Sequence, residues 1–98
     1  PPAEERLEVS PLSSLHVAPG RGLITLVVRN GGSLDTSVVR VEMGRGSCKG
    51  NLTLGIGESA VISCTIKGKV EVGQIYEVRI CTSSDKCFKA FLRAEEER

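Results

Sequence analysis

Four cysteines, at positions 48, 64, 81 and 87, are the residues of this sequence with the widest chemical repertoire. Thiols can ligate a metal, exchange electrons or form structural disulfides. A zinc site needs closely spaced ligands, but the cysteine intervals hold 15, 16 and 5 residues without a C-x-x-C knuckle, and His16 is the only histidine. A redox pair would open a helix or adjoin a basic cluster, whereas only Lys86 stands beside Cys87. The sequence therefore favours structural disulfides.

The stretch CTSSDKC (81–87) predicts one disulfide within a hairpin. Two apolar-alternating runs, 74–82 and 86–93, flank its polar centre. A hairpin centred on Ser84 pairs residues whose numbers sum to 168, so that Cys81 faces Cys87. The same register gathers the apolar residues of both runs on the opposite face, and one arrangement thus explains both patterns.

The other two cysteines follow a similar rule around GIGE (55–58). A hairpin whose paired numbers sum to 112 places Cys48 opposite Cys64. Four cysteines allow three connectivities, and the register argument selects one of them. We therefore predict a buried Cys48–Cys64 disulfide and an outward-facing disulfide in the last hairpin.

Groups that could perform catalysis are sparse. His16 is the only histidine available as a general base, and it stands in the alternating segment SLHVAP (14–19), which is typical of a surface or strand edge. The two GRG triplets, at 20–22 and 44–46, do not follow a strand and open a helix as a phosphate-binding loop does. We therefore expect no enzymatic activity, no metal and no cofactor.

Length and composition exclude several classes of protein. The chain has 98 residues, enough for one small domain, and 13 Lys plus Arg balance 12 Asp plus Glu. Balanced charge and few aromatics (Tyr76, Phe88, Phe91) argue against nucleic acid as a partner. The longest apolar run, LITLVV (23–28), is far shorter than the roughly 20 residues of a membrane helix. The start without Met suggests that a targeting or anchoring segment is missing, so we expect membrane attachment only through such an anchor.

Short runs rich in β-branched residues recur between Gly-rich turns, which predicts an all-β fold. We expect an immunoglobulin-like antiparallel β-sandwich of about seven strands, with residues 1–6 as a flexible linker, 7–93 as one domain and 94–98 as a charged tail. The predicted strands are 7–9 with 13–18, 22–29, 36–43, 48–54, 59–67, 74–82 and 86–93.

Alternation within these runs predicts which side chains form the core. Val27 and Val38 are expected to point away from it. The residues expected to point inward are Ile24, Leu26, Val28, Val39, Val41, Met43, Leu52, Leu54, Ile62, Cys64, Ile66, Tyr76, Val78, Ile80, Phe88, Ala90 and Leu92.

Two sequence patterns resemble known proteins. The segment GQIY (73–76), at the start of a strand, resembles the tyrosine corner of immunoglobulin-like sandwiches, which implies that the Tyr76 hydroxyl bonds to backbone. The segments VVRNGG, SVVRVEM, GIGESAVISCTI and GQIYEVRICTSSDKCFKAFL, within residues 22–92, resemble β-sandwich ectodomains of archaeal surface proteins. These include type IV pilin-like proteins and the pilin-like stator subunits of the archaellum. The resemblance implies a domain outside the membrane that binds itself, a related sandwich subunit or a surface-layer protein.

The register of the last hairpin predicts where a partner binds. Its outward face carries an exposed apolar pair, Phe91 and Ile75, among charged side chains. Alternatively, another segment such as the N-terminal strand covers Phe91. The predicted partner-binding residues are Ile75, Glu77, Arg79, Lys89 and Phe91.

Several features indicate an extracellular or cell-surface location. Disulfides form in oxidising compartments, and also inside hyperthermophiles. Asn51-Leu52-Thr53 is a glycosylation sequon, and the low amide content with an excess of Glu over Asp and of Arg over Lys hints at a thermophile. We expect a structural or interaction module of a surface appendage or envelope complex. The alternative is a secreted carbohydrate- or cell-wall-binding adhesion module, which the shortage of aromatic residues disfavours.

Overall fold

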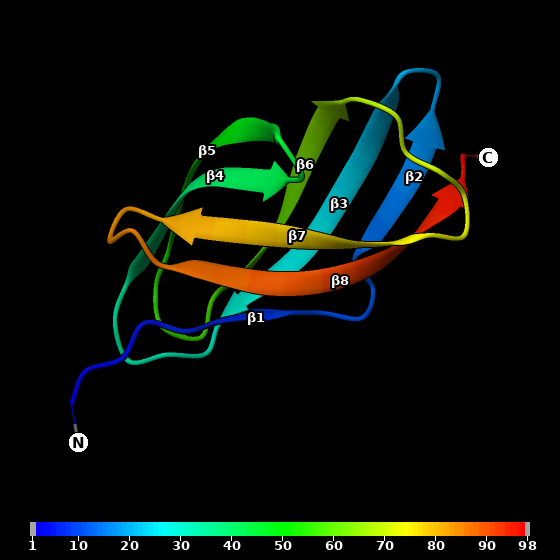
Figure 1. Ribbon diagram of the computed structural model, residues 1–98. Coiled ribbons are helices and arrows are strands. Elements are labelled where there is room, and N and C mark those ends of the chain that lie inside the picture. The colour runs from blue at the N-terminus through cyan, green and yellow to red at the C-terminus, as the bar shows by residue number, and fades with distance from the viewer. Residues whose placement is uncertain (1, 98) are drawn as a thin grey trace.

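The computed structural model describes residues 2–97 and shows an all-β protein, which confirms the all-β part of the predicted fold class (Figure 1). No helix occurs within the described range. The strands are β1 (Leu7–Val9), β2 (Ser14–Ala18), β3 (Arg21–Asn30), β4 (Thr36–Met43), β5 (Gly46–Leu54), β6 (Ser59–Lys67), β7 (Ile75–Thr82) and β8 (Cys87–Glu96).

The eight strands form one curled, mixed sheet (Figure 1). Its order is β1-β3-β2-β8-β7-β4-β5, and β6 pairs with the other edge of β3. Six of these strands are joined only by antiparallel ladders, whereas the end of β8 pairs in parallel with β2, between Leu15–Val17 and Ala94–Glu96. β8 therefore belongs to both halves of the curl: one half contains β1, β2, β3 and β6, and the other contains β4, β5 and β7.

Eight strands replace the expected seven because one predicted edge segment is divided. β1 and β2 both pair with the same edge of β3, β1 at residues 28–30 and β2 at residues 21–25. Between them the chain leaves the sheet in a turn, closed by a 3.0 Å bond from the Ser13 amide to the Ser10 carbonyl. Pro11 within this turn has no amide hydrogen for a sheet ladder.

The core lies inside the curl and contains most of the residues that alternation predicted. Ile24, Leu26 and Val28 of β3 are almost completely buried. The exception concerns β4, where Val38 is 1% exposed although it was expected to face outward, and Val39 is only half-buried. A β-bulge between Val38 and Arg40 shifts the register against β5 and reverses the alternation at this point.

The hairpin predicted between residues 48–54 and 59–67 does not form. β5 pairs with β4 and β6 pairs with β3, so the GIGE turn crosses from one half of the curl to the other. The predicted cysteine pair is nevertheless present, because Cys48 and Cys64 form a disulfide across the two halves, with Cα atoms 6.0 Å apart. Cys64 is buried, as expected, and Cys48 is half-buried.

Both ends of the predicted domain need correction. Residues 4–6, expected within a flexible linker, bond to the loop after β3: the Ser33 amide donates to the Glu4 carbonyl at 2.8 Å and the Gly31 amide to the Arg6 carbonyl at 3.0 Å. At the other end β8 continues to Glu96, because the parallel ladder with β2 extends it into the predicted tail. Positions 1 and 98 lie outside the described residues.

Candidate functional site

The last hairpin has the register predicted from the sequence. β7 and β8 pair without a shift from Ile75↔Arg93 to Cys81↔Cys87, and Cys81 and Cys87 form a disulfide. The disulfide lies on the outer face of the hairpin, beside Glu42; Cys87 is exposed there, whereas Cys81 is completely buried. The difference arises because β7 lies between β8 and β4, where Arg40 pairs with Cys81.

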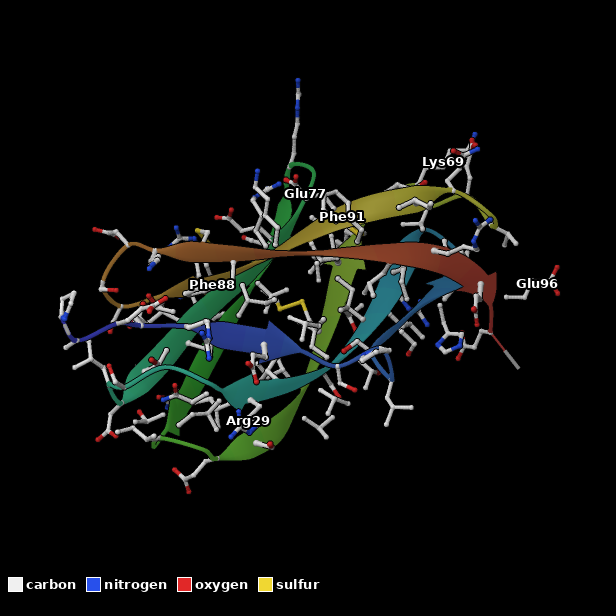
Figure 2. All side chains as sticks on the ribbon, turned by 90° about the horizontal axis from the view of Figure 1, so that it is seen from below. Arg29, Lys69, Glu77, Phe88, Phe91 and Glu96 are labelled. Atoms are coloured by element: carbon white, nitrogen blue, oxygen red, sulfur yellow. A yellow bond between two sulfur atoms is a disulfide. The ribbon has the colours of Figure 1, made fainter. Side chains whose placement is uncertain are left out.

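The predicted binding residues lie together on the outer face of this hairpin. Phe91 pairs with Glu77, and Arg79 pairs with Lys89. Phe91 is 66% exposed and Ile75 is 59% exposed. The N-terminal strand does not cover Phe91, since β1 pairs with β3. Figure 2 shows Phe91 and Glu77 on the side of β8 away from Phe88, which points toward the core.

Ion pairs fix the charged side chains of this face in a row across three strands. Arg79 Nε lies 3.0 Å from a Glu42 oxygen, and Arg79 Nη1 lies 3.1 Å from Glu77. The row extends on one side to Arg40, whose Nε lies 2.6 Å from Glu42, and on the other to Lys89, whose Nζ lies 3.7 Å from Glu77. We name Arg40, Glu42, Arg79, Glu77 and Lys89 the charge row. It holds a fixed pattern of alternating charge beside the exposed apolar pair.

The electrostatics of the charge row centre on Glu42. Hydrogen bonds from Arg40 and Arg79 to the ionised carboxylate hold the pKa of Glu42 below its ordinary value. Reciprocally, Glu42 and Glu77 raise the pKa of Arg79, so its guanidinium stays charged at every physiological pH. Glu42 and Arg79 therefore both stay charged near neutral pH.

The lowered pKa of Glu42 predicts a pH-dependent contribution to stability. A carboxylate with a depressed folded pKa stabilises the fold above its unfolded pKa, about 4.3, and loses this effect as pH falls through the folded pKa. We expect Glu42→Gln to unfold at lower urea concentration than the wild type at pH 7, and the two midpoints to converge by about pH 2. Glu97→Gln, at the exposed end of the chain, controls for loss of one negative charge. A difference that stays constant across this pH range would contradict the prediction.

Glu42 also lies beside the disulfide of the last hairpin. Its carboxylate and the sulfur atoms of Cys81 and Cys87 all lie within 4.8 Å of one another. The two sulfurs are bonded to each other, so neither offers the thiolate that a zinc ion would need. The two cysteines therefore form a structural disulfide beside Glu42 of the charge row.

Two further predicted residues have clear structural positions. The Tyr76 hydroxyl accepts a 2.9 Å hydrogen bond from the Glu71 amide, which is the backbone bond that the sequence pattern predicted. Asn51 is exposed on β5, a strand at the edge of the sheet. The sequon is accessible there, and its Thr53 hydroxyl lies 2.9 Å from the Ser37 hydroxyl.

Sequence reasoning missed Arg40 and Glu42 as members of the site. They come from β4, which pairs with β7 although more than thirty residues of chain separate them. The alternation of residues 36–43 shows that this segment is a strand, but it carries no signal for which strand lies next to it. Only the complementary charges of Glu42 and Arg79 hinted at the contact.

The comparisons with known proteins add no relationship to these observations. No protein-family model matches the sequence, and no curated protein matches it. Between residues 2 and 97 the structure has no helix of the length and apolar character that a membrane crossing requires. A functional assignment therefore depends on the fold and on the outer face of β7 and β8.

Proposed function

We propose that this chain is a non-enzymatic interaction domain that works outside the cytoplasm and binds another protein through the outer face of β7 and β8. The observation that carries the proposal is the exposed pair of Phe91 and Ile75 beside the charge row. Protein interfaces commonly place an aromatic anchor at the centre and polar groups at the rim. This face has the same arrangement.

The face is also rigid, which favours binding. Phe91 stands on an uninterrupted ladder, and the Cys81–Cys87 disulfide closes the hairpin at its end. Burying Phe91 and Ile75 in a partner would stabilise a complex by about 1.5–3 kcal/mol for each side chain. Little conformational entropy opposes this gain, because the charge row already holds the surrounding side chains in place.

The fold supports a more specific class for the domain. Two halves that face each other across one core, together with the Tyr76 corner bond, support an immunoglobulin-like β-sandwich. With the resemblance of residues 22–92 to archaeal surface ectodomains, this supports a subunit of a surface appendage or envelope complex, such as a pilin-like archaellum stator. Its partner would be a second copy, a related sandwich subunit or a surface-layer protein.

The two disulfides support the extracellular part of the proposal. Both cysteine pairs are joined, and no free cysteine is found among the residues that the structure describes. Two disulfides in a small domain are typical of an oxidising environment. The exposed sequon at Asn51 agrees with a cell-surface or secreted location.

A pair of charge-introducing variants tests the interaction face. Phe91→Glu is expected to weaken self-association, or binding to isolated cell envelope, by at least about tenfold, because it replaces the apolar anchor with a charge that binding would have to desolvate. Val61→Glu is the matched control, since Val61 is similarly exposed (64%) but lies on β6 in the other half of the curl. Sedimentation velocity over a concentration series measures self-association of each variant, and co-sedimentation with isolated envelope measures its binding there. Equal effects of the two variants would refute the assignment of the face.

A further inference from the structure

A groove runs between β1 and the middle of β8. Its volume is about 660 Å³. It is closed at one end by the parallel ladder between β2 and β8, and at the other end by a 3.2 Å bond from Lys86 Nζ to the Glu5 carbonyl. Figures 1 and 2 show β1 and β8 running side by side. The apolar residues along the groove are Leu7, Val9, Pro11, Ala90, Phe91 and Leu92.

The β8 side of the groove is a free sheet edge. The Ala94 amide donates to the Gln74 carbonyl and the Thr82 amide to the Lys86 carbonyl, so even-numbered positions of β8 bond toward β7. Bonding direction alternates along an antiparallel ladder, so Lys89 and Phe91 point their amide and carbonyl groups away from β7. Within residues 2–97, β8 meets a second strand only at Ala94–Glu96. The backbone groups of Lys89 and Phe91 therefore face the groove.

The β1 side of the groove is free as well. The Gly31 amide donates to the Arg6 carbonyl and the Ser10 amide to the Val27 carbonyl, so positions 6, 8 and 10 bond toward β3. Leu7 and Val9 consequently direct their amides and carbonyls away from β3. The Ser10–Ser13 turn separates β1 from β2. The ladder between β2 and β8 therefore does not continue along β1.

The charges along β8 indicate the chemistry of an occupant. Lys89 and Arg93 lie two residues on either side of Phe91 and share its outward face, and all three are exposed. Among the residues that line the groove, the carboxylate of Glu95 lies at the closed end where β2 already pairs. Glu77, across the β7–β8 ladder, lies 3.7 Å from Lys89 Nζ and balances part of its charge. A strand laid along this edge would place its own outward side chains beside a cation, a phenyl ring and a second cation. Acidic, apolar and acidic residues in alternation complement that order.

We infer that the groove between β1 and β8 binds an extended acidic segment of a partner protein, added as a strand to the free edge of β8. This inference rests on the proposed interaction function and names the part of the partner that is recognised. Backbone hydrogen bonds hold such a segment, and its alternate side chains provide specificity. Its inward side chains enter the apolar groove, and its outward ones meet Lys89, Phe91 and Arg93.

The same charges disfavour a second copy of this chain as the occupant. Two β8 edges that pair about Phe91 would place Lys89 of one copy opposite Arg93 of the other. Like charges directly opposite each other destabilise an antiparallel pair. An acidic strand instead gains opposite-charge contacts at both positions.

The test uses the full chain and the synthetic peptide acetyl-SEVIVES-amide, whose central pattern reads the same in both strand directions. Saturable binding is expected in a fluorescence anisotropy titration, with shifts of the Lys89 and Phe91 amide signals in NMR spectra. A peptide N-methylated at its three central amides should bind at least about tenfold more weakly, because several backbone hydrogen bonds are lost together. The charge-reversed peptide SKVIVKS should bind about threefold to tenfold more weakly.

A proline variant tests the same edge from the protein side. Lys89→Pro removes an amide that points into the groove and leaves the ladder to β7 intact, whereas Lys89→Gln removes only the charge. The proline variant should lose peptide binding, and the glutamine variant should retain most of it. Equal binding of the N-methylated peptide, equal binding of SKVIVKS, or no saturable binding to wild-type protein would each overturn the inference. If Phe91→Glu alone still weakens association, the proposed function stands without this groove.

Discussion

Replacing both Cys48 and Cys64 with alanine is expected to lower the free energy of unfolding by about 3 kcal/mol and Tm by roughly 12–24 °C. The disulfide joins residues 16 positions apart, and the released loop regains its conformational entropy in the unfolded chain. In the folded protein the bond joins β5 to β6, and within residues 2–97 no backbone ladder connects these two strands. Calorimetry of both proteins measures the difference.

The second disulfide provides a matched control for this prediction. Cys81 and Cys87 lie only 6 positions apart, and the β7–β8 ladder already holds them together. Replacing both with alanine should lower the free energy of unfolding by about 2 kcal/mol, less than loss of the first bond. The Cys48–Cys64 disulfide is not the main constraint on this fold if the two double variants are equally stable, or if the variant without Cys81 and Cys87 is the less stable of the two.

The two disulfides also show which parts of a β fold the sequence reveals. The 81–87 hairpin was predictable with its register, because its strands are neighbours in sequence and one turn fixes which residues pair. The same reasoning predicted the Cys48–Cys64 bond from a hairpin that does not exist. Alternation identifies a strand and its inner face, but the partner of a strand depends on contacts between distant segments. The pairs β3–β6, β4–β7 and β2–β8 are of this kind.

The candidate site divides in the same way. The exposed positions of Phe91 and Ile75 followed from the local register of one hairpin. Glu42 of the charge row, and the groove beside β8, depend on which distant strands lie next to β7 and β8. The bulge at Val38 is a further case, because one extra residue in β4 relative to β7 reverses the inward face of β4 without a clear sign in the sequence.

The sequence predicts a turn at Asn30 but does not reveal the hydrogen bonds that its side chain forms. In the sequence, Asn30-Gly31 is an ordinary turn signal after a strand. In the structure the Asn30 side chain is completely buried and forms three hydrogen bonds. Its Nδ2 donates to the Leu34 carbonyl at 2.7 Å and to the Leu54 carbonyl at 3.0 Å, and its Oδ1 accepts from the Gly32 amide at 3.0 Å. One amide thus joins the end of β3, the following loop and the end of β5.

Asn30→Ala is expected to lower the free energy of unfolding by about 3 kcal/mol, because three bonds are lost and the part-buried Leu34 carbonyl and the buried Leu54 carbonyl lose donors. Asn51→Ala, at an exposed position, should change stability by less than about 0.5 kcal/mol.

Asn30→Asp tests the hydrogen bonds separately from the shape of the side chain, since a carboxylate fits the site but faces two carbonyl oxygens. Its instability should be greatest at neutral pH and should decrease at low pH, where the protonated acid can donate one bond. Urea unfolding at pH 7 and pH 3 measures all three variants, and a wild-type midpoint for Asn30→Ala would show that the buried amide does not hold these segments together.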